Sequence, residues 1–256
     1  MRLVADSALV DRLHPSPCHE PRRGTGRPDM LLLHYTGMAS CERAIDWLSR
    51  PEAKVSCHYV IDVDGRITQM VAESRRAWHA GVSAWAGETD VNSCSIGFEI
   101  HNPGHDHGYP DFPETQMAAV KALAKDVVDR WSIPRERVLA HSDVAPLRKN
   151  DPGEKFDWAV LAAAGVGLWL PPEPVDDRDE GLGLDTASAQ VARAQALLGS
   201  CGYEVPASGR LDDTTCRVLT AFQRHFRPAR VDGRLDASTL GTLARVAASM
   251  RSRTTA

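Results

Sequence analysis

The chain has 256 residues, of which 43% are apolar and 25% charged, a balance typical of a soluble globular protein with one large domain or two ordinary ones. A formal net charge of -4 without any block of Lys and Arg gives no reason to expect nucleic acid or an acidic membrane surface as a partner. No stretch approaches the roughly 18 consecutive apolar residues of a membrane-spanning helix.

The N-terminus and the cysteines bear on the cellular compartment. Residues 1–15 carry charged side chains among the apolar ones and lack the continuous apolar core of a secretory signal. The six cysteines show neither a Cys-x-x-Cys pair nor regular spacing, which favours free thiols over disulfides in a chain of this size. Both observations predict a cytoplasmic protein, with the periplasm as the alternative, because an exported chain without its signal has the same features.

The first half of the chain alternates strand and helix patterns. Residues 30–33 form an apolar run fit for a strand buried on both faces, and this run delivers His34 to its end. A helix is expected over residues 40–50, where the apolar positions follow a 3.6-residue period. Residues 57–71 alternate apolar and polar side chains around an Asp-Gly pair, which predicts a β-hairpin.

Two further strands and a helix complete the predicted domain. Residues 95–100 read as a strand in which Gly97 indicates a bulge or a close backbone approach. Residues 114–131 show the apolar stripe of an amphipathic helix. The short apolar run 138–140 then delivers His141, as the first strand delivers His34. The pattern predicts the α/β class, with a mixed β-sheet flanked by helices.

A second unit follows the α/β domain. We place the first domain at residues 1–170, a stiff Pro-rich and acidic linker with nothing to bury at 171–186, and a three-helix domain at 187–256. Within the last, Gly-Arg-Leu-Asp at 209–212 recurs at 233–236, and each copy reads as a turn whose Asp caps a helix. This repeat indicates how the unit is built, not what it binds.

Five polar residues of the first domain suggest a hydrolytic metal centre. His34, His141 and Asp151 offer two imidazoles and one carboxylate, a set that leaves the fourth position of a zinc ion open for water. Glu99, inside an apolar strand, is a plausible general base for that water. Lys149 lies two residues before Asp151 and places positive charge where a carbonyl oxygen becomes negative. The implied reaction is metal-assisted hydrolysis of an acyl bond.

Other histidines compete with this interpretation. His101, His105 and His107 form a denser cluster and a rival metal site, but their loop is rich in turn residues, so we interpret them as solvated. A lone histidine after an apolar run is also more often a core residue than a ligand. His58, in the hairpin, is expected to be structural.

Five collinear motifs, spanning about residues 15–161, resemble those of a known family. They are similar to the zinc-dependent N-acetylmuramoyl-L-alanine amidases, and most of all to the branch that includes AmpD and AmiD. The matching runs are 33–36, 56–61, 77–81, 92–100 and 141–153.

The resemblance implies a role for each candidate residue. It implies that His34, His141 and Asp151 bind one zinc ion per chain, that Glu99 is the general base and that Lys149 stabilises the oxyanion. Phage-lysozyme relatives carry Cys as third ligand and Tyr in place of the glutamate, so the chain stands apart from them. Further matching positions are expected to contact substrate, namely Trp78, His79 and Asn92.

The implied substrate is the amide between the lactyl group of N-acetylmuramic acid and L-alanine, in peptidoglycan or in muropeptides that include 1,6-anhydro forms. The second domain resembles the three-helix peptidoglycan-binding domain through Gly202-Tyr203 and Phe222-Gln223. Two alternatives remain open: a non-catalytic peptidoglycan recognition protein on the same fold, and a zinc peptidase. The sequence does not define an oligomeric state.

Overall fold

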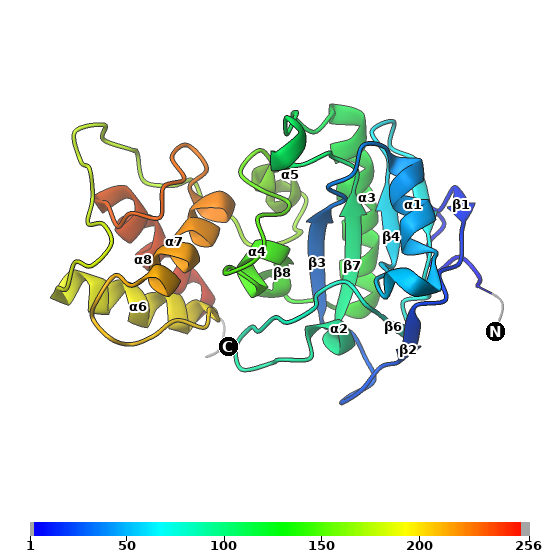
Figure 1. Cartoon of the computed structure of the whole chain (residues 1–256), viewed down its shortest axis with the longest axis horizontal. Helices are drawn as coiled ribbons and strands as arrows, with labels where there is room; N and C mark the ends of the chain where they lie inside the picture. The colour runs from blue at the N-terminus through cyan, green and yellow to red at the C-terminus, as the bar shows by residue number, and fades with distance from the viewer. Residues whose placement is uncertain (1–2, 252–256) are drawn as a thin grey trace.

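The computed structural model describes residues 3–251 and confirms the predicted α/β class. A six-stranded mixed sheet forms the centre of the first domain (Figure 1), in the order β1 (Arg12–Leu13), β5 (Ile67–Gln69), β4 (Tyr59–Ile61), β7 (Ser95–Ile100), β3 (Met30–Tyr35) and β8 (Val138–Ala140). The predicted hairpin is the antiparallel pair of β4 and β5, and the other neighbours pair in parallel. A small second sheet joins β2 (His19–Pro21) to β6 (Arg75–Ala77).

Helices cover both faces of the large sheet because its central strands are apolar on both sides. α3 (Glu114–Trp131) packs against Leu31, Leu33 and their neighbours on one face. α1 (Cys41–Leu48) covers part of the other, where Ser40 caps its first turn by accepting from the backbone N–H of Arg43. Shorter helical segments lie in the connections between these elements: α2 (Val91–Cys94), α4 (His141–Val144), α5 (Trp158–Ala163) and the 3₁₀ turns Pro51–Ala53, His105–His107 and Arg135–Arg137.

Three helices form the C-terminal unit, as the repeat predicts: α6 (Ala189–Cys201), α7 (Asp213–Phe226) and α8 (Ala237–Arg251). Asp212 and Asp236, the last residues of the two Gly-Arg-Leu-Asp copies, accept hydrogen bonds from the backbone N–H groups of Thr215 and Thr239. Both are therefore helix N-caps, and the expectation from the sequence is confirmed.

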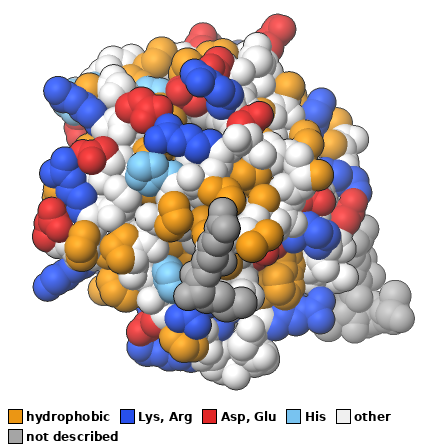
Figure 2. Space-filling view, turned by 90° about the vertical axis from the view of Figure 1, so that its right-hand side faces the viewer, with side chains coloured by type: hydrophobic (Ala, Val, Ile, Leu, Met, Phe, Trp, Pro, Cys, Tyr) orange, Lys and Arg blue, Asp and Glu red, His pale blue; other side chains and the backbone are white. Residues whose placement is uncertain are grey.

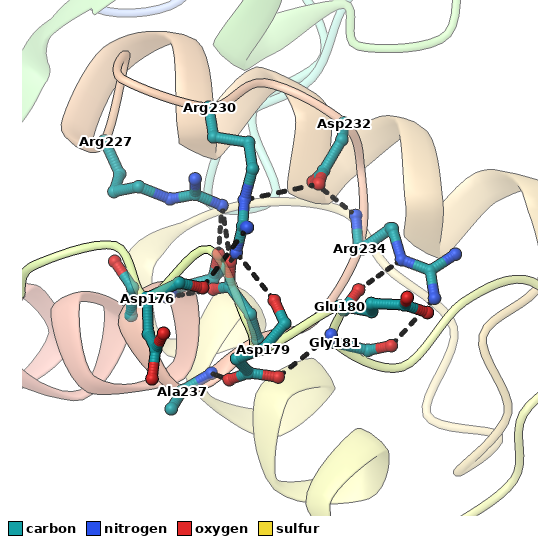
Figure 3. A network of polar contacts seen from close by, with 12 residues as sticks. Asp176, Asp179, Glu180, Gly181, Arg227, Arg230, Asp232, Arg234 and Ala237 are labelled. Atoms are coloured by element: carbon teal, nitrogen blue, oxygen red, sulfur yellow. Dashed lines mark hydrogen bonds and ion pairs between the residues drawn. The ribbon is translucent and has the colours of Figure 1, made fainter.

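The charged linker is fastened to the helical unit rather than free. None of residues 171–186 is buried, in agreement with the sequence, but groups near Asp179 are held by the turn between α7 and α8 and by the start of α8 (Figure 3). Arg230 donates to the carbonyl oxygen of Asp179 at 3.0 Å, and Arg234 donates to that of Gly181 at 2.8 Å. The N–H of Ala237 donates to the Asp179 carboxylate at 2.8 Å.

The helical unit shares an apolar core with the sheet domain. Met30 and Leu32, on the sheet face opposite α3, belong to the same cluster as Leu198 and Phe222 of the C-terminal helices. Figure 1 shows α4 and β8 on the side of the sheet that faces α7. The two units therefore pack against each other through buried side chains, which the sequence pattern does not predict.

Surface and thiol features agree with the composition. Figure 2 shows acidic and basic side chains interspersed over the face near β1 and α1, without a field of one sign. All six cysteines are free, as predicted. Among residues 3–251, no helix has the length and apolar content needed to cross a membrane.

Candidate functional site

The site lies at the carboxyl ends of the parallel strands β3, β7 and β8. His34 on β3 and Glu99 on β7 are direct neighbours in register. His141 immediately follows β8, whose last residue, Ala140, pairs with Leu33 of β3. Because the carboxyl ends of parallel strands meet at one edge of a sheet, residues far apart in sequence converge there.

His34, His141 and Asp151 meet at one point. The Nδ1 atoms of the two histidines are 2.8 Å apart, and they lie 3.1 Å and 3.0 Å from Oδ2 of Asp151. Their exposed fractions are 1%, 3% and 6%, so bulk water does not separate them. Tetrahedral zinc with bonds of about 2.0–2.2 Å places its ligand atoms about 3.3–3.6 Å apart, so the three side chains would move slightly outward to hold an ion.

The hydrogen positions of the His141 ring follow from its neighbours. Its Nε2 atom lies 3.1 Å from the carbonyl oxygen of Ala80, which only accepts hydrogen bonds. The shorter of the contacts at Nε2 is thus made with a hydrogen on this atom, and in that neutral tautomer Nδ1 presents a lone pair to Asp151.

A longer chain of contacts fixes the His34 ring in the same way. Ser95 uses its hydroxyl hydrogen on the carbonyl oxygen of Val91 at 2.6 Å, so its oxygen accepts from Nε2 of His79 at 3.4 Å. Nδ1 of His79 is then the acceptor for Nε2–H of His34 at 3.0 Å. The remaining nitrogen of His34, Nδ1, has its lone pair directed at His141 and Asp151.

The protonation states agree with this inventory. Burial, and after it the neighbouring His141, lowers the pKa of His34 to about 4, so the ring is neutral at pH 7. Burial raises the pKa of Asp151, but the neighbouring His141 and His34 outweigh it and bring the pKa below its usual range, so this group is a carboxylate at pH 7. Three electron-pair donors thus face one another, an arrangement that a divalent cation stabilises and that fits the open zinc set.

A cavity of about 300 Å³ opens beside these three groups, and Glu99 and Lys149 line it. Oε2 of Glu99 is buried and has no hydrogen-bond partner among the described residues. Burial, and next to it the charge of Asp151, raises the pKa of Glu99 well above the usual value. An unpartnered carboxyl oxygen facing a cavity is available for a proton from water.

Of the three residues expected to contact substrate, two line the cavity and one does not. Trp78 and His79 line the cavity, and Nε1 of Trp78 is buried without a partner among the described residues. Asn92 does not line it. Its Oδ1 atom accepts from the N–H groups of His79 and Ala80 at 3.0 Å and 2.8 Å. The side chain of Asn92 therefore holds the turn that carries His79.

The rival histidine cluster does not gather into a metal site, and the interpretation of its members as solvated is wrong for two of them. His101 is buried, with Nδ1 3.0 Å from the Thr36 hydroxyl. His105 is half-buried and bonds Tyr35 and Glu154. Only His107 is exposed. His58 is structural, as predicted, since its Nδ1 accepts from the N–H of Gly97 at 2.9 Å.

Sequence reasoning missed Arg148, whose neighbour Lys149 it singled out. The Arg148 guanidinium donates to the carbonyl oxygens of Ala80 and Val82, the latter at 2.8 Å, and its Nη2 lies 3.3 Å from Nε2 of His141. It thus holds the turn at 80–82 against the loop between His141 and Asp151. An arginine in a loop gives no periodic signal, so only the fold shows this contact.

Two family models match the chain. One describes N-acetylmuramoyl-L-alanine amidase and covers residues 24–154, and the other describes a peptidoglycan binding domain and covers residues 187–243. Among curated proteins, AmiD of Escherichia coli K12 is 37% identical over 83% of this chain and 80% of its own length. AmpD of Enterobacter cloacae is 31% identical over 63% of this chain and 94% of its own length.

Solved structures agree with the sequence comparisons. The complex of E. coli AmiD with anhydro-N-acetylmuramic acid-L-Ala-D-gamma-Glu-L-Lys has a TM-score of 0.73 at 33% identity and covers 97% of this chain and 93% of that protein. AmpDh3 of Pseudomonas aeruginosa has a TM-score of 0.75 at 34% identity, over 88% and 93%. The resemblance inferred from five motifs is confirmed: the chain belongs to the N-acetylmuramoyl-L-alanine amidase family.

Proposed function

We propose that this protein is a zinc-dependent amidase that hydrolyses the bond between the lactyl group of N-acetylmuramic acid and L-alanine. The substrates are peptidoglycan or muropeptides, including 1,6-anhydro forms. The proposal rests on one observation: three buried electron-pair donors lie together beside a cavity. The carboxyl group of Glu99 and the ammonium group of Lys149 line that cavity.

His34, His141 and Asp151 would hold the ion through Nδ1, Nδ1 and Oδ2. When bound, zinc supplies Lewis-acid chemistry and makes water a nucleophile at neutral pH. His79 supports the site indirectly: its acceptor nitrogen bonds Nε2 of His34, and this contact fixes the orientation of the His34 ring.

Other side chains act on the substrate and on the proton. Glu99 takes a proton from the attacking water and returns it to the leaving amine. Lys149 stabilises the negative charge that develops on the carbonyl oxygen. Trp78 lines the same cavity, and its unpartnered Nε1–H offers a donor to a bound substrate.

The anhydro-muropeptide part of the proposal is supported by the ligands named for AmiD and for an AmpDh3 complex with anhydromuramic pentapeptide. A non-catalytic recognition protein on the same fold is the second candidate. It does not need the five groups at the metal and cavity positions, all of which are present here.

Incubation with a muramoyl-tripeptide and its 1,6-anhydro form, with and without a strong chelator, tests the function. We expect free tripeptide in both digests, identified by mass spectrometry, and none after chelation. Binding of both compounds without release of peptide would support the recognition protein instead, and cleavage within the peptide would support a peptidase.

Gly97→Ala is expected to damage the support of His34. A Cβ atom at this position would lie 2.5 Å from Nδ1 of His79, so the imidazole has to move away from Nε2 of His34. Because loss of such a supporting contact typically costs 10–100-fold in metal affinity, we expect zinc binding to weaken by about tenfold. Competition with a chromophoric chelator measures it. Gly199→Ala, on a helix with no atom within 4 Å of the new methyl, is the matched control.

The place of action is tested separately. We propose the cytoplasm, where soluble muropeptides would be the substrate, with periplasmic wall as the alternative that a peptidoglycan-binding unit favours. Fractionation of the tagged protein in its own cells decides between them, and release of peptide from intact sacculi by the full chain would favour the wall.

A further inference from the structure

Side chains of the C-terminal unit bond to α4, the helix that begins with His141. Asp143, two residues after His141 on α4, is 1% exposed. Its Oδ2 atom accepts from the backbone N–H of Ala140 at 2.8 Å, at the start of the helix. A carboxyl group in this position fixes the first turn, and with it the direction in which His141 leaves the backbone.

The other hydrogen bonds of Asp143 come from the helical unit. The Tyr203 hydroxyl donates to Oδ1 at 2.6 Å, and Nδ1 of His225 contacts Oδ2 at 2.7 Å. Both side chains are buried, so water does not replace them. A carboxylate only accepts hydrogen bonds, and Nδ1 of His225 is therefore a donor.

The ring of His225 is itself fixed by packing. It stacks on Phe226 with a centroid distance of 4.0 Å and on Trp158 with one of 3.7 Å. Trp158 begins α5, seven residues after Asp151 on the same loop. In addition, Nε of Arg224 on α7 lies 3.4 Å from Oε2 of Glu154. α7 therefore contacts the helix that carries His141 and also the segment that follows Asp151.

Because Asp143 is buried, loss of its hydrogen bonds to Tyr203 and His225 is expected to be costly. A buried carboxylate that loses a hydrogen-bond partner keeps the free-energy cost of its lost hydration, and that cost is larger for a charged group than for a neutral one. Without Tyr203 or His225 the carboxyl group has to move or admit water. Either response shifts the first turn of α4, and a metal site tolerates little displacement of a ligand.

We propose that Tyr203 and His225 are positioning residues of the metal site, acting on His141 through Asp143, so that the helical unit is part of the catalytic centre rather than only a tethered module. The inference rests on the proposed zinc site.

Two substitutions in the full-length chain remove the donors with little change of shape. Tyr203→Phe deletes one hydroxyl, and His225→Phe keeps a ring between Trp158 and Phe226. Gln195→Met is the matched control. Gln195 is buried in α6 and bonds Thr215 and the turn at Arg210 inside the helical unit, away from α4. Zinc affinity, from competition with a chromophoric chelator, and the melting temperature of the zinc-free proteins are the readouts.

We expect the double variant to bind zinc about tenfold more weakly or worse, and Tyr203→Phe alone to fall between it and the wild type. His225→Gln, which retains an N–H donor, is expected to bind zinc more tightly than His225→Phe. The zinc affinity of Gln195→Met is expected to stay within about twofold of that of the wild type, even if its melting temperature falls as much as that of the double variant.

Unchanged zinc affinity in the double variant would overturn the inference, and so would an equal loss in Gln195→Met. Should the double variant fail to fold, the same comparison is made with Tyr203→Phe. The readout needs no substrate, so a chain that binds zinc but leaves muropeptides intact would defeat the proposed function alone.

Discussion

Glu99→Gln is expected to lower kcat/KM for a muramoyl-tripeptide by about 10²–10⁴-fold, the range for loss of a general base. The amide keeps the size of the side chain but does not take a proton from water. Zinc affinity should stay close to that of the wild type, because Glu99 is not one of the three grouped donor residues. Steady-state kinetics at saturating zinc measure the effect, and activity within a few-fold of the wild type would remove Glu99 from this role.

The pH dependence of stability provides an independent check on Glu99. Its pKa in the folded, zinc-free chain is raised by burial and by the charge of Asp151, so the native state holds a proton that the unfolded chain loses above about pH 4.3. The folded form is therefore destabilised as pH rises through and beyond that value. Glu99→Gln should gain stability relative to the wild type as pH increases from 4 to 8, measured by urea unfolding. A constant difference would contradict the raised pKa.

Asp151→Ala is expected to abolish hydrolysis and to remove zinc from the purified protein. The substitution leaves two imidazoles, one ligand fewer than a catalytic zinc site requires. Metal analysis and peptide release from the tripeptide substrate measure the two effects, and a chelator should reproduce the second in the wild type. His107→Ala, at an exposed histidine of the rival cluster, is the control and should retain zinc and activity.

The results that would contradict this prediction are equally direct. Activity of the wild type that persists in chelator would exclude the metal mechanism. Loss of zinc in His107→Ala, with retention in Asp151→Ala, would move the metal site to the loop at 101–107.

The sequence alone determined the strands that deliver the site. The apolar runs at 30–33, 95–100 and 138–140 predicted strands, and the sequence placed His34 and His141 at the ends of the first and the last. This worked because burial on both faces leaves a strong local pattern, whereas the parallel pairing that brings the two strand ends together was given by the structure. The motif order then indicated the family, and the repeat at 209–212 and 233–236 predicted the capped helices.

Only the tertiary structure decided which partner each buried polar group has. Asn92 supports a backbone turn, His101 and His105 are bonded rather than solvated, and Asp143 takes donors from residues 60 and 82 positions away. Periodicity records which side of an element is buried, whereas a hydrogen-bond partner depends on how two distant elements pack. For this reason the contact between the helical unit and the metal-site helix was not predictable from sequence.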